Sequence, residues 1–405
     1  MKNKQKIPNG WEEMRLDKIC NIGDGNHSSK YPRADEMINS GIPFIRGADF
    51  VNGHIKTDNL KYISKEKHQN LKKGKVLAKD ILMVNRGEIG KTALVPELLN
   101  NSNLNAQLVW LRSKASMNNK FLFYILRLSS TIRRLKRYQS GGALQQITRK
   151  EIDKFEITTP PLPEQNRIVS VLETWDSYLE KLEKKIETKK KIKKGLMQQL
   201  LTGNKRLPGF NEKWKEIKLG EIIKNVSSRN RNLEISQVLS VTNKKGFTLP
   251  GENFSRTIAS KDLSNYKIVR SGQFAFNPSR INVGSLARLD NFKLGLLSPM
   301  YIVFDVHKDF LISDFLLYWI FTARAHASIQ NNSTGSVRQS LDYKGLADIK
   351  IKLPSLEEQH AIAKIMTTAD EEIETLEKQK EKYEDQKKYL LNNLITGKIR
   401  VPKND

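Results

Sequence analysis

Cysteine and histidine are scarce in this chain of 405 residues, which has one cysteine, Cys20, and six histidines. A single cysteine excludes internal disulfides and the usual cysteine-based zinc sites. The histidines, at positions 27, 54, 68, 307, 326 and 360, show no H-x-x-x-H pairing and no shared spacing with carboxylates. Cys20 is best interpreted as a small core residue. The composition therefore predicts neither a metal site nor cysteine chemistry.

Long hydrophobic runs are missing as well, although a helix needs roughly 20 apolar residues to cross a bilayer. The most apolar stretch, Phe310–Phe321, is interrupted by Ser313 and Asp314 and predicts a buried helix. The basic N-terminus runs straight into a Pro-Asn-Gly segment at residues 8–10 without an apolar core, so it is not a signal peptide. We expect a cytoplasmic protein.

Two segments resemble parts of catalytic motifs, but each lacks essential residues. Residues 85–92 resemble a phosphate-binding P-loop, which needs glycine where Asn85 stands. Asn277-Pro278 begins like the tetrad with which amino-methyltransferases hold a flipped base, but Ser279 and Arg280 follow. We find neither a nucleophile-base pair nor a glycine-rich loop for S-adenosylmethionine. The sequence predicts a protein that is not an enzyme and binds no cofactor.

The charge is strongly one-sided, with 70 Lys and Arg against 44 Asp and Glu and a formal net charge of +26. Such an excess favours a polyanionic partner, with nucleic acid as the first candidate. The length predicts at least two domains, because single cores seldom grow beyond about 250–300 residues.

The second half of the chain repeats the first. A constant offset of 194 residues joins residues 139–208 to residues 333–402. The matched residues include Gly141 and Gly335, Gln145 and Gln339, Pro160 and Pro354, and Glu164-Gln165 and Glu358-Gln359. Near the start of each half, WEEMRLDKI from Trp11 recurs as WKEIKLGEI from Trp214, at an offset of 203. A constant scaffold therefore carries inserts of variable length, as expected where loops on a scaffold bind different targets.

Each repeat ends in a long amphipathic helix. Apolar residues recur at steps of four and three from Ile168 and again from Ile362. Pro163 and Ser355 suit helix starts, and a glycine, as at position 203, suits the residue after each helix. We predict about 33 residues and about 50 Å for each helix. The helices are expected to pair antiparallel, although lysines in the seam argue against a tight zipper, and the run Lys189–Lys194 is interpreted as a solvated helix face rather than a phosphate contact.

The remaining segments are predicted to form mixed α/β structure. Strands are predicted at residues 81–84, 108–111 and 301–304, and helices at 121–135 and 315–327. The predicted fold class is α/β (α+β), with two tandem globular domains, two long antiparallel coiled-coil helices and a pseudo-twofold internal repeat. The predicted boundaries are 1–160 for the first domain, 161–203 for the central helix, 204–354 for the second domain and 355–405 for the C-terminal helix.

Several short stretches, in this order and this duplication, resemble the specificity subunits of type I restriction-modification systems. They are Gly41–Arg46, Asp80–Leu82 followed by Gly87–Gly90, Pro161–Gln165, Ser240–Thr242, Gly272–Phe274, Leu297–Tyr301, Leu356–Gln359, and the helix ends Leu-Leu-Thr-Gly and Leu-Ile-Thr-Gly. Each stretch is short and is weak evidence alone, but their order and duplication make the resemblance strong across nearly the whole chain.

The resemblance implies two target-recognition domains that read a bipartite DNA sequence, with a gap set by helix length. It implies double-stranded DNA as a partner, together with two modification subunits that bind S-adenosylmethionine and methylate adenine, and restriction subunits that use ATP and Mg. Those cofactors belong to the partners. A nonspecific DNA-binding coiled-coil scaffold protein stays open as the alternative, whereas a self-sufficient methyltransferase or nuclease would need catalytic motifs.

Candidate contact residues follow from side-chain chemistry. Loop residues able to make bidentate base contacts are Arg46, Arg86, Gln145, Gln146, Asn243, Arg280, Asn282, Arg338 and Gln339. Residues better suited to phosphates are Lys30, Lys91, Arg149, Lys244 and Lys245. The candidate partner-binding residues of the helices are Leu172, Leu179, Leu182, Ile186, Leu196, Leu200, Ile373, Leu376, Tyr383, Leu390 and Leu394.

Overall fold

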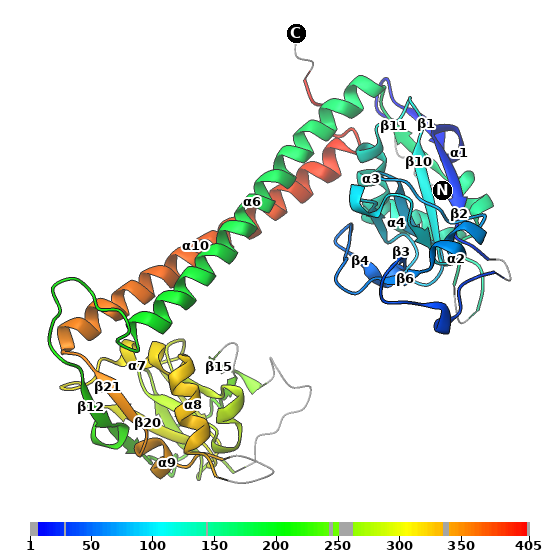
Figure 1. The fold of residues 1–405 in the computed structure, drawn as a ribbon. Helices are drawn as coiled ribbons and strands as arrows, with labels where there is room; N and C mark the ends of the chain where they lie inside the picture. The colour runs from blue at the N-terminus through cyan, green and yellow to red at the C-terminus, as the bar shows by residue number, and fades with distance from the viewer. Residues whose placement is uncertain are drawn as a thin grey trace. The chain divides into compact units, whose positions relative to one another are not determined.

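The computed structural model describes residues 7–27, 30–142, 145–242, 246–250, 262–334 and 340–402. The chain divides into two compact units: unit 1 comprises residues 1–181 and 380–405, and unit 2 comprises residues 182–379. Each unit contains antiparallel strands, short helices and part of each long helix (Figure 1). Among the described residues, the helices are all too short or too polar to span a membrane.

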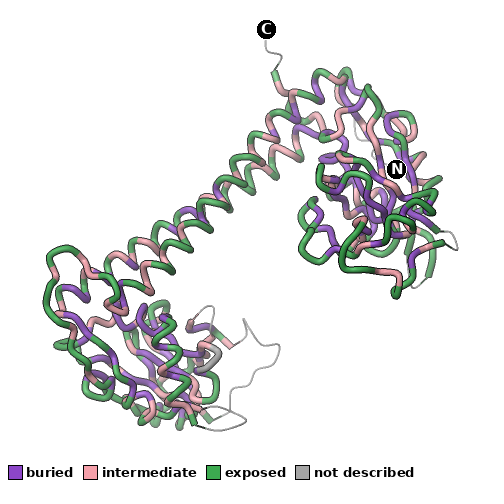
Figure 2. Tube along the Cα trace, in the orientation of Figure 1, coloured by how far each residue is buried: buried purple, intermediate pink, exposed green. Residues whose placement is uncertain are grey.

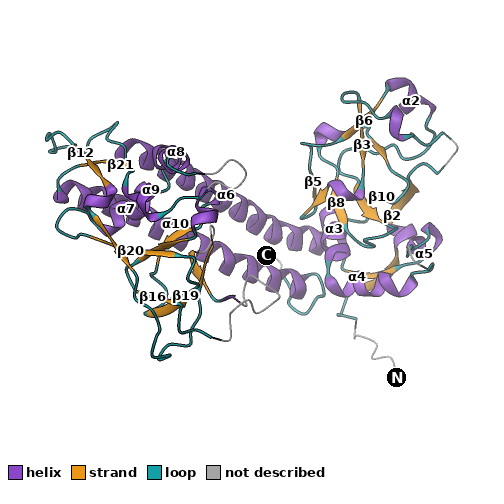
Figure 3. Ribbon diagram, turned by 90° about the horizontal axis from the view of Figure 1, so that it is seen from below, coloured by secondary structure: helices purple, strands orange, loops and turns teal. Residues whose placement is uncertain are grey.

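Unit 1 is organised around a four-stranded antiparallel sheet with the strand order β2-β10-β7-β8. Its central strand β7 is the apolar run Ile81–Val84, which is buried along its whole length. Helix α3 packs against β8 and β10 (Figure 3). The strands are β1 (Glu12–Arg15), β2 (Cys20–Asp24), β3 (Ile42–Ile45), β4 (Phe50–Val51), β5 (His54–Ile55), β6 (Lys61–Ile63), β7, β8 (Thr92–Leu94), β9 (Asn103–Leu104), β10 (Leu108–Ser113) and β11 (Glu156–Thr159). The short helices are α1 (Leu16–Ile19), α2 (Lys65–Asn70), α3 (Asn119–Arg127), α4 (Ser129–Leu135) and α5 (Arg149–Asp153).

Unit 2 repeats this plan with the strand order β13-β20-β17-β18. The β1–β11 pair of unit 1 corresponds to the β12–β21 pair, with Met14 opposite Ile157 in one and Ile217 opposite Ile351 in the other. The predicted fold class and internal repeat are thus confirmed. The strands are β12 (Lys215–Lys218), β13 (Ile223–Val226), β14 (Ser240–Thr242), β15 (Gly246–Thr248), β16 (Lys267–Arg270), β17 (Phe274–Phe276), β18 (Leu286–Arg288), β19 (Leu294–Leu297), β20 (Ile302–Val306) and β21 (Lys350–Leu353). The helices are η7 (Pro278–Val283), α7 (Ser313–Trp319), α8 (Ala323–Asn331) and α9 (Tyr343–Ala347).

The two short predicted helices are each broken into two. Residues 121–135 form α3 and α4, because Leu128 adopts an extended conformation with ψ 134. In unit 2 the break lies before α8, where the Thr322 hydroxyl accepts a hydrogen bond from the Ala325 amide at 3.1 Å. An N-cap of this kind starts a new helix in a new direction. Apolar periodicity alone does not reveal such a break.

The long helices α6 (Leu162–Leu200) and α10 (Leu356–Leu394) have 39 residues each, more than the predicted 33 or so. The extra residues lie at the start of each helix, before Ile168 in α6 and Ile362 in α10. In α6, Pro163 needs no intrahelical N–H partner and is compatible with a first turn. Gly203 and Gly397 adopt positive φ angles of 75° and 70° after the helices, as predicted. Buried and exposed residues alternate along both helices (Figure 2).

The long helices contribute to the core of each unit. Ile168 and Leu172 of α6, with Leu394 of α10, belong to the main core of unit 1. Leu200 of α6 and Met366 of α10 belong to the main core of unit 2. Each globular domain is therefore completed by helix segments that are distant in the sequence.

We expect Cys20 to resist alkylation in the native protein. The thiol is 1% exposed and donates to the Leu16 carbonyl at 3.0 Å, and burial raises its pKa to about 12. Because the thiolate is the reactive form, iodoacetamide at pH 8 should leave intact protein unmodified and modify it fully in urea. Intact mass spectrometry measures both, and rapid native modification would contradict the burial of Cys20.

Candidate nucleic-acid interface

Arg86, Gln145 and Gln146 are brought together at one end of the main sheet in unit 1. The loop after β7 pairs with residues 145–147: Gly87 donates to the Gln145 carbonyl at 3.1 Å, and Arg86 and Gln146 form a β-bridge. All three side chains are exposed. Because β7 continues into strand β8 rather than a helix, the segment that resembles a P-loop connects two strands.

Unit 2 has an equivalent loop pair. Thr334 and Ser340 bond each other's backbones at 2.9 Å in both directions, as Ser140 and Gln146 do at 2.9 and 3.0 Å. Leu341 then donates to the Pro278 carbonyl at 3.1 Å, which joins this segment to η7. Arg280 lies exposed on η7. Both units therefore present polar side chains on two paired loops at the same place in the fold.

The Asn277-Pro278 segment has a structural role in this loop. The Asn277 side chain accepts a hydrogen bond from the Ser279 amide at 3.1 Å and so caps η7. Asn282 lies in the same helix, and its side chain is outside the described residues, as are Asn243, Lys244, Lys245, Arg338 and Gln339.

Other candidate residues of unit 1 interact within the chain. Arg46 binds Asp49 with Nη2 to Oδ1 at 2.7 Å, and this hydrogen bond raises the pKa of the guanidinium. Lys91 bonds Glu88 at 2.8 Å, and Arg149 lies 3.8 Å from Asp24 and 3.7 Å from Asp153. Lys30 is exposed in a turn.

A Tyr-Asp-Lys cluster, which the sequence reasoning missed, joins the globular domain of unit 1 to the long helices. Tyr124 of α3 donates its hydroxyl to Oδ2 of Asp176 on α6. Lys387 of α10 donates to Oδ1 of the same carboxylate. Lys387 is a seam lysine that was expected to loosen the helix pair, and instead it pairs with an acid across the helices.

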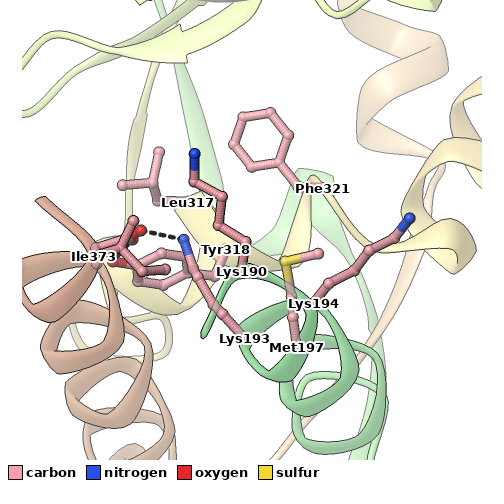
Figure 4. A pocket seen from close by; sticks show the side chains of 9 residues that line it. Lys190, Lys193, Lys194, Met197, Leu317, Tyr318, Phe321 and Ile373 are labelled. Carbon is pink, nitrogen blue, oxygen red and sulfur yellow. Dashed lines mark hydrogen bonds and ion pairs between the residues drawn. The ribbon is translucent and has the colours of Figure 1, made fainter. Parts of the chain in front are cut away.

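The same cluster recurs in unit 2. Tyr318 of α7 donates to Oδ2 of Asp370 on α10 at 3.0 Å, and Lys193 of α6 donates to Oδ1. The Lys193 ammonium also lies 5.1 Å from the centre of the Tyr318 ring, and the dashed contact in Figure 4 marks its ion pair with Asp370. The constant offset of 194 relates all three residues to those of unit 1 and is the signal that could have revealed both clusters.

The lysine run on α6 is only partly the solvated face that was predicted. Lys189 pairs with Glu372 at 2.7 Å, and Lys190 pairs with Glu377 at 2.6 Å. These carboxylates lie on α10, which runs antiparallel to α6 in this unit. The lysines therefore contribute to helix pairing.

The family model of the type I restriction modification DNA specificity domain matches this chain twice, over residues 8–193 and 211–384. The chain belongs to this family. The specificity subunit of the type I restriction enzyme MjaVIII of Methanocaldococcus jannaschii is 26% identical over 98% of this chain and 94% of its own length. The putative MjaX specificity subunit of the same organism is 28% identical over 98% of this chain and 95% of its own length.

Solved structures agree on the fold. The S subunit of the type I restriction-modification system of M. genitalium has a TM-score of 0.56 and 16% identity, and the alignment covers 97% of this chain and 98% of that chain. This chain is a type I specificity subunit, a non-catalytic component of a system in which partner subunits carry out catalysis.

Most helix residues predicted to bind partners of this specificity subunit are packed inside the chain. The buried ones are Leu172, Leu182, Ile186, Leu200, Ile373, Leu376 and Leu394. The partly exposed ones are Leu179, Leu196, Tyr383 and Leu390. The apolar periodicity therefore marks packing within this chain as well as any surface for partners.

Proposed function

We propose that this chain is the DNA-recognition subunit of a type I restriction-modification complex and that its two recognition domains read a bipartite target. One observation supports this most strongly: the same pair of loops recurs at the same end of the main sheet in both units. Two equivalent loop pairs suit two half-sites, because each can enter one groove of the duplex.

The chemistry of the exposed side chains fits base readout. Arginine pairs bidentately with guanine, and glutamine with adenine, so Arg86, Gln145 and Gln146 suit one half-site and Arg280 the other. The net charge of +26 supplies contacts to phosphates that do not depend on sequence.

The chain also scaffolds the modification and restriction subunits in this proposal. Ile192 on α6 is 51% exposed, and Tyr389 on α10 is 61% exposed. Tyr389 lines a concavity with Trp175 and Leu390, and a contiguous apolar patch of this kind is typical of a protein-binding face. S-adenosylmethionine, ATP and Mg would be bound by the partner subunits, and this chain would bind DNA and those subunits.

A domain exchange tests the proposal. Residues 207–350 would be replaced by the corresponding residues of a family member with a different target, and methylated sequences would be mapped in cells with the cognate modification subunit. Only one half-site is expected to change, because the other loop pair stays native. The reciprocal exchange of residues 1–160 should change only the other half-site. A target that is unaltered by both exchanges would refute the proposal and favour the nonspecific scaffold.

A further inference from the structure

Asp176 and Asp370 each join three elements through one carboxylate. In both clusters Oδ2 accepts from a tyrosine of the globular domain, and Oδ1 accepts from a lysine of the opposite long helix. Two oxygens that accept from two directions constrain an orientation in a way that apolar packing does not, because hydrogen bonds are directional and hydrophobic contact is not. The use of the same atoms in both units indicates a shared role.

The tyrosines are suited to this role. Tyr124 is 5% exposed and Tyr318 is 9% exposed. Burial raises the pKa of Tyr318 to about 12, and it also raises the pKa of Tyr124. Both hydroxyls therefore stay protonated and remain donors near neutral pH.

Each cluster lies in the wall of a concavity, so packing is incomplete on that side of the contact between domain and helices. The apolar core and, in unit 1, the Lys120–Glu173 ion pair also hold α3 against α6. In unit 2 the concavity measures about 510 Å³ and is lined by Tyr318, Asp370 and the side chains of Met197 and Phe321 (Figure 4). In unit 1 the equivalent concavity measures about 1210 Å³ and is lined by polar as well as apolar groups. Where the side chains border open space, the directional hydrogen bonds add a restriction on rotation that packing does not supply.

We propose that Asp176 and Asp370 are positioning residues that fix each recognition domain on the long helices and thereby hold the DNA target to a single gap length. This proposal rests on the proposed function, since only a reader of two half-sites has a gap to define. Weakening either Tyr-Asp-Lys cluster should let its domain rotate on the long helices, so that the complex also accepts half-sites that lie closer together or farther apart.

Gap selectivity is the quantity to measure. Complexes of the full chain with its cognate modification subunit would methylate DNA with the natural gap and with gaps one base pair shorter or longer. In Asp176→Asn or Asp370→Asn the ratio of natural-gap to altered-gap rates should fall by about tenfold, as one charge-assisted hydrogen bond is lost. Glu187→Gln and Glu381→Gln remove exposed charges from the same helices and should leave the ratio unchanged.

Tyr124→Phe and Tyr318→Phe remove only a hydroxyl and should lower the ratio in the same direction by a smaller factor. If the aspartate variants fail to fold, these phenylalanine variants test the positioning role instead. A wild-type ratio in folded aspartate variants, or in both phenylalanine variants, would overturn the positioning role. If the wild-type complex methylates no bipartite target at all, the proposed function itself fails instead.

Discussion

Replacing Arg206 by alanine is expected to lower the free energy of unfolding of unit 2 by about 3 kcal/mol. Arg206 holds Glu358 through two hydrogen bonds of 2.8 and 2.7 Å, and the Trp214 indole adds a third at 3.1 Å. The Glu358 side chain is 1% exposed. Without the guanidinium, a buried carboxylate keeps one neutral donor, and an uncompensated buried charge is costly.

Scanning calorimetry of the full chain measures this effect as a fall of roughly 6–12 °C in the transition of unit 2. Adding Glu358→Gln to Arg206→Ala should recover much of the loss, because the buried charge is then removed. Arg400→Ala is the equivalent variant in unit 1, because Arg400 binds Glu164 there as Arg206 binds Glu358 in unit 2, with Nη2 to Oε2 at 2.6 Å. A double variant no more stable than Arg206→Ala alone would contradict the buried-charge explanation.

Replacing Gln165 by leucine is expected to destabilise unit 1 by about 2–4 kcal/mol. The Gln165 side chain is 1% exposed and accepts from the Asn118 amide at 2.8 Å while donating to the Pro160 carbonyl at 2.8 Å. Leucine fills similar space but leaves both backbone groups without these partners. Asn118 also caps α3, so the loss should spread to that helix.

Hydrogen exchange of the backbone amides at residues 116–121 measures this effect, and these amides are expected to exchange faster in Gln165→Leu than in the wild type. Gln359→Leu should act in the same way in unit 2, where Gln359 accepts from the Ile312 amide at 2.9 Å. Gln199→Leu, at an exposed position of α6, is the control and should change nothing. Unchanged exchange in Gln165→Leu would show that the bond to Asn118 contributes little.

The sequence was informative where local pattern and repetition coincide. The run Ile81–Val84 was predicted as a strand and forms β7 with these bounds. The glycines after the long helices, and the repeat itself, were also read correctly. These features depend on residues close in sequence or on a comparison of the chain with itself, and neither requires knowledge of the tertiary packing.

Contacts between distant residues could not be predicted in the same way. Tyr124, Asp176 and Lys387 lie on three different helices, α3, α6 and α10. In the sequence, Lys387 is only a charged residue at a position of the helix seam where an apolar one is expected. The Glu-Gln pairs mark the repeat and the resemblance in the sequence, but their partners Asn118 and Arg206 lie far away along the chain. One candidate residue does carry a local signal of its partner: Arg46 lies three positions from Asp49, and such a spacing favours an ion pair within the chain.

Adenine-methylation mapping of genomic DNA from cells that carry this chain and its cognate modification subunit tests the central claim most directly. A bipartite target read by two domains predicts one split motif, methylated in these cells and absent from cells that lack only this chain. An unchanged methylation pattern, with the modification subunit present and active, would contradict the recognition role and favour nonspecific DNA binding.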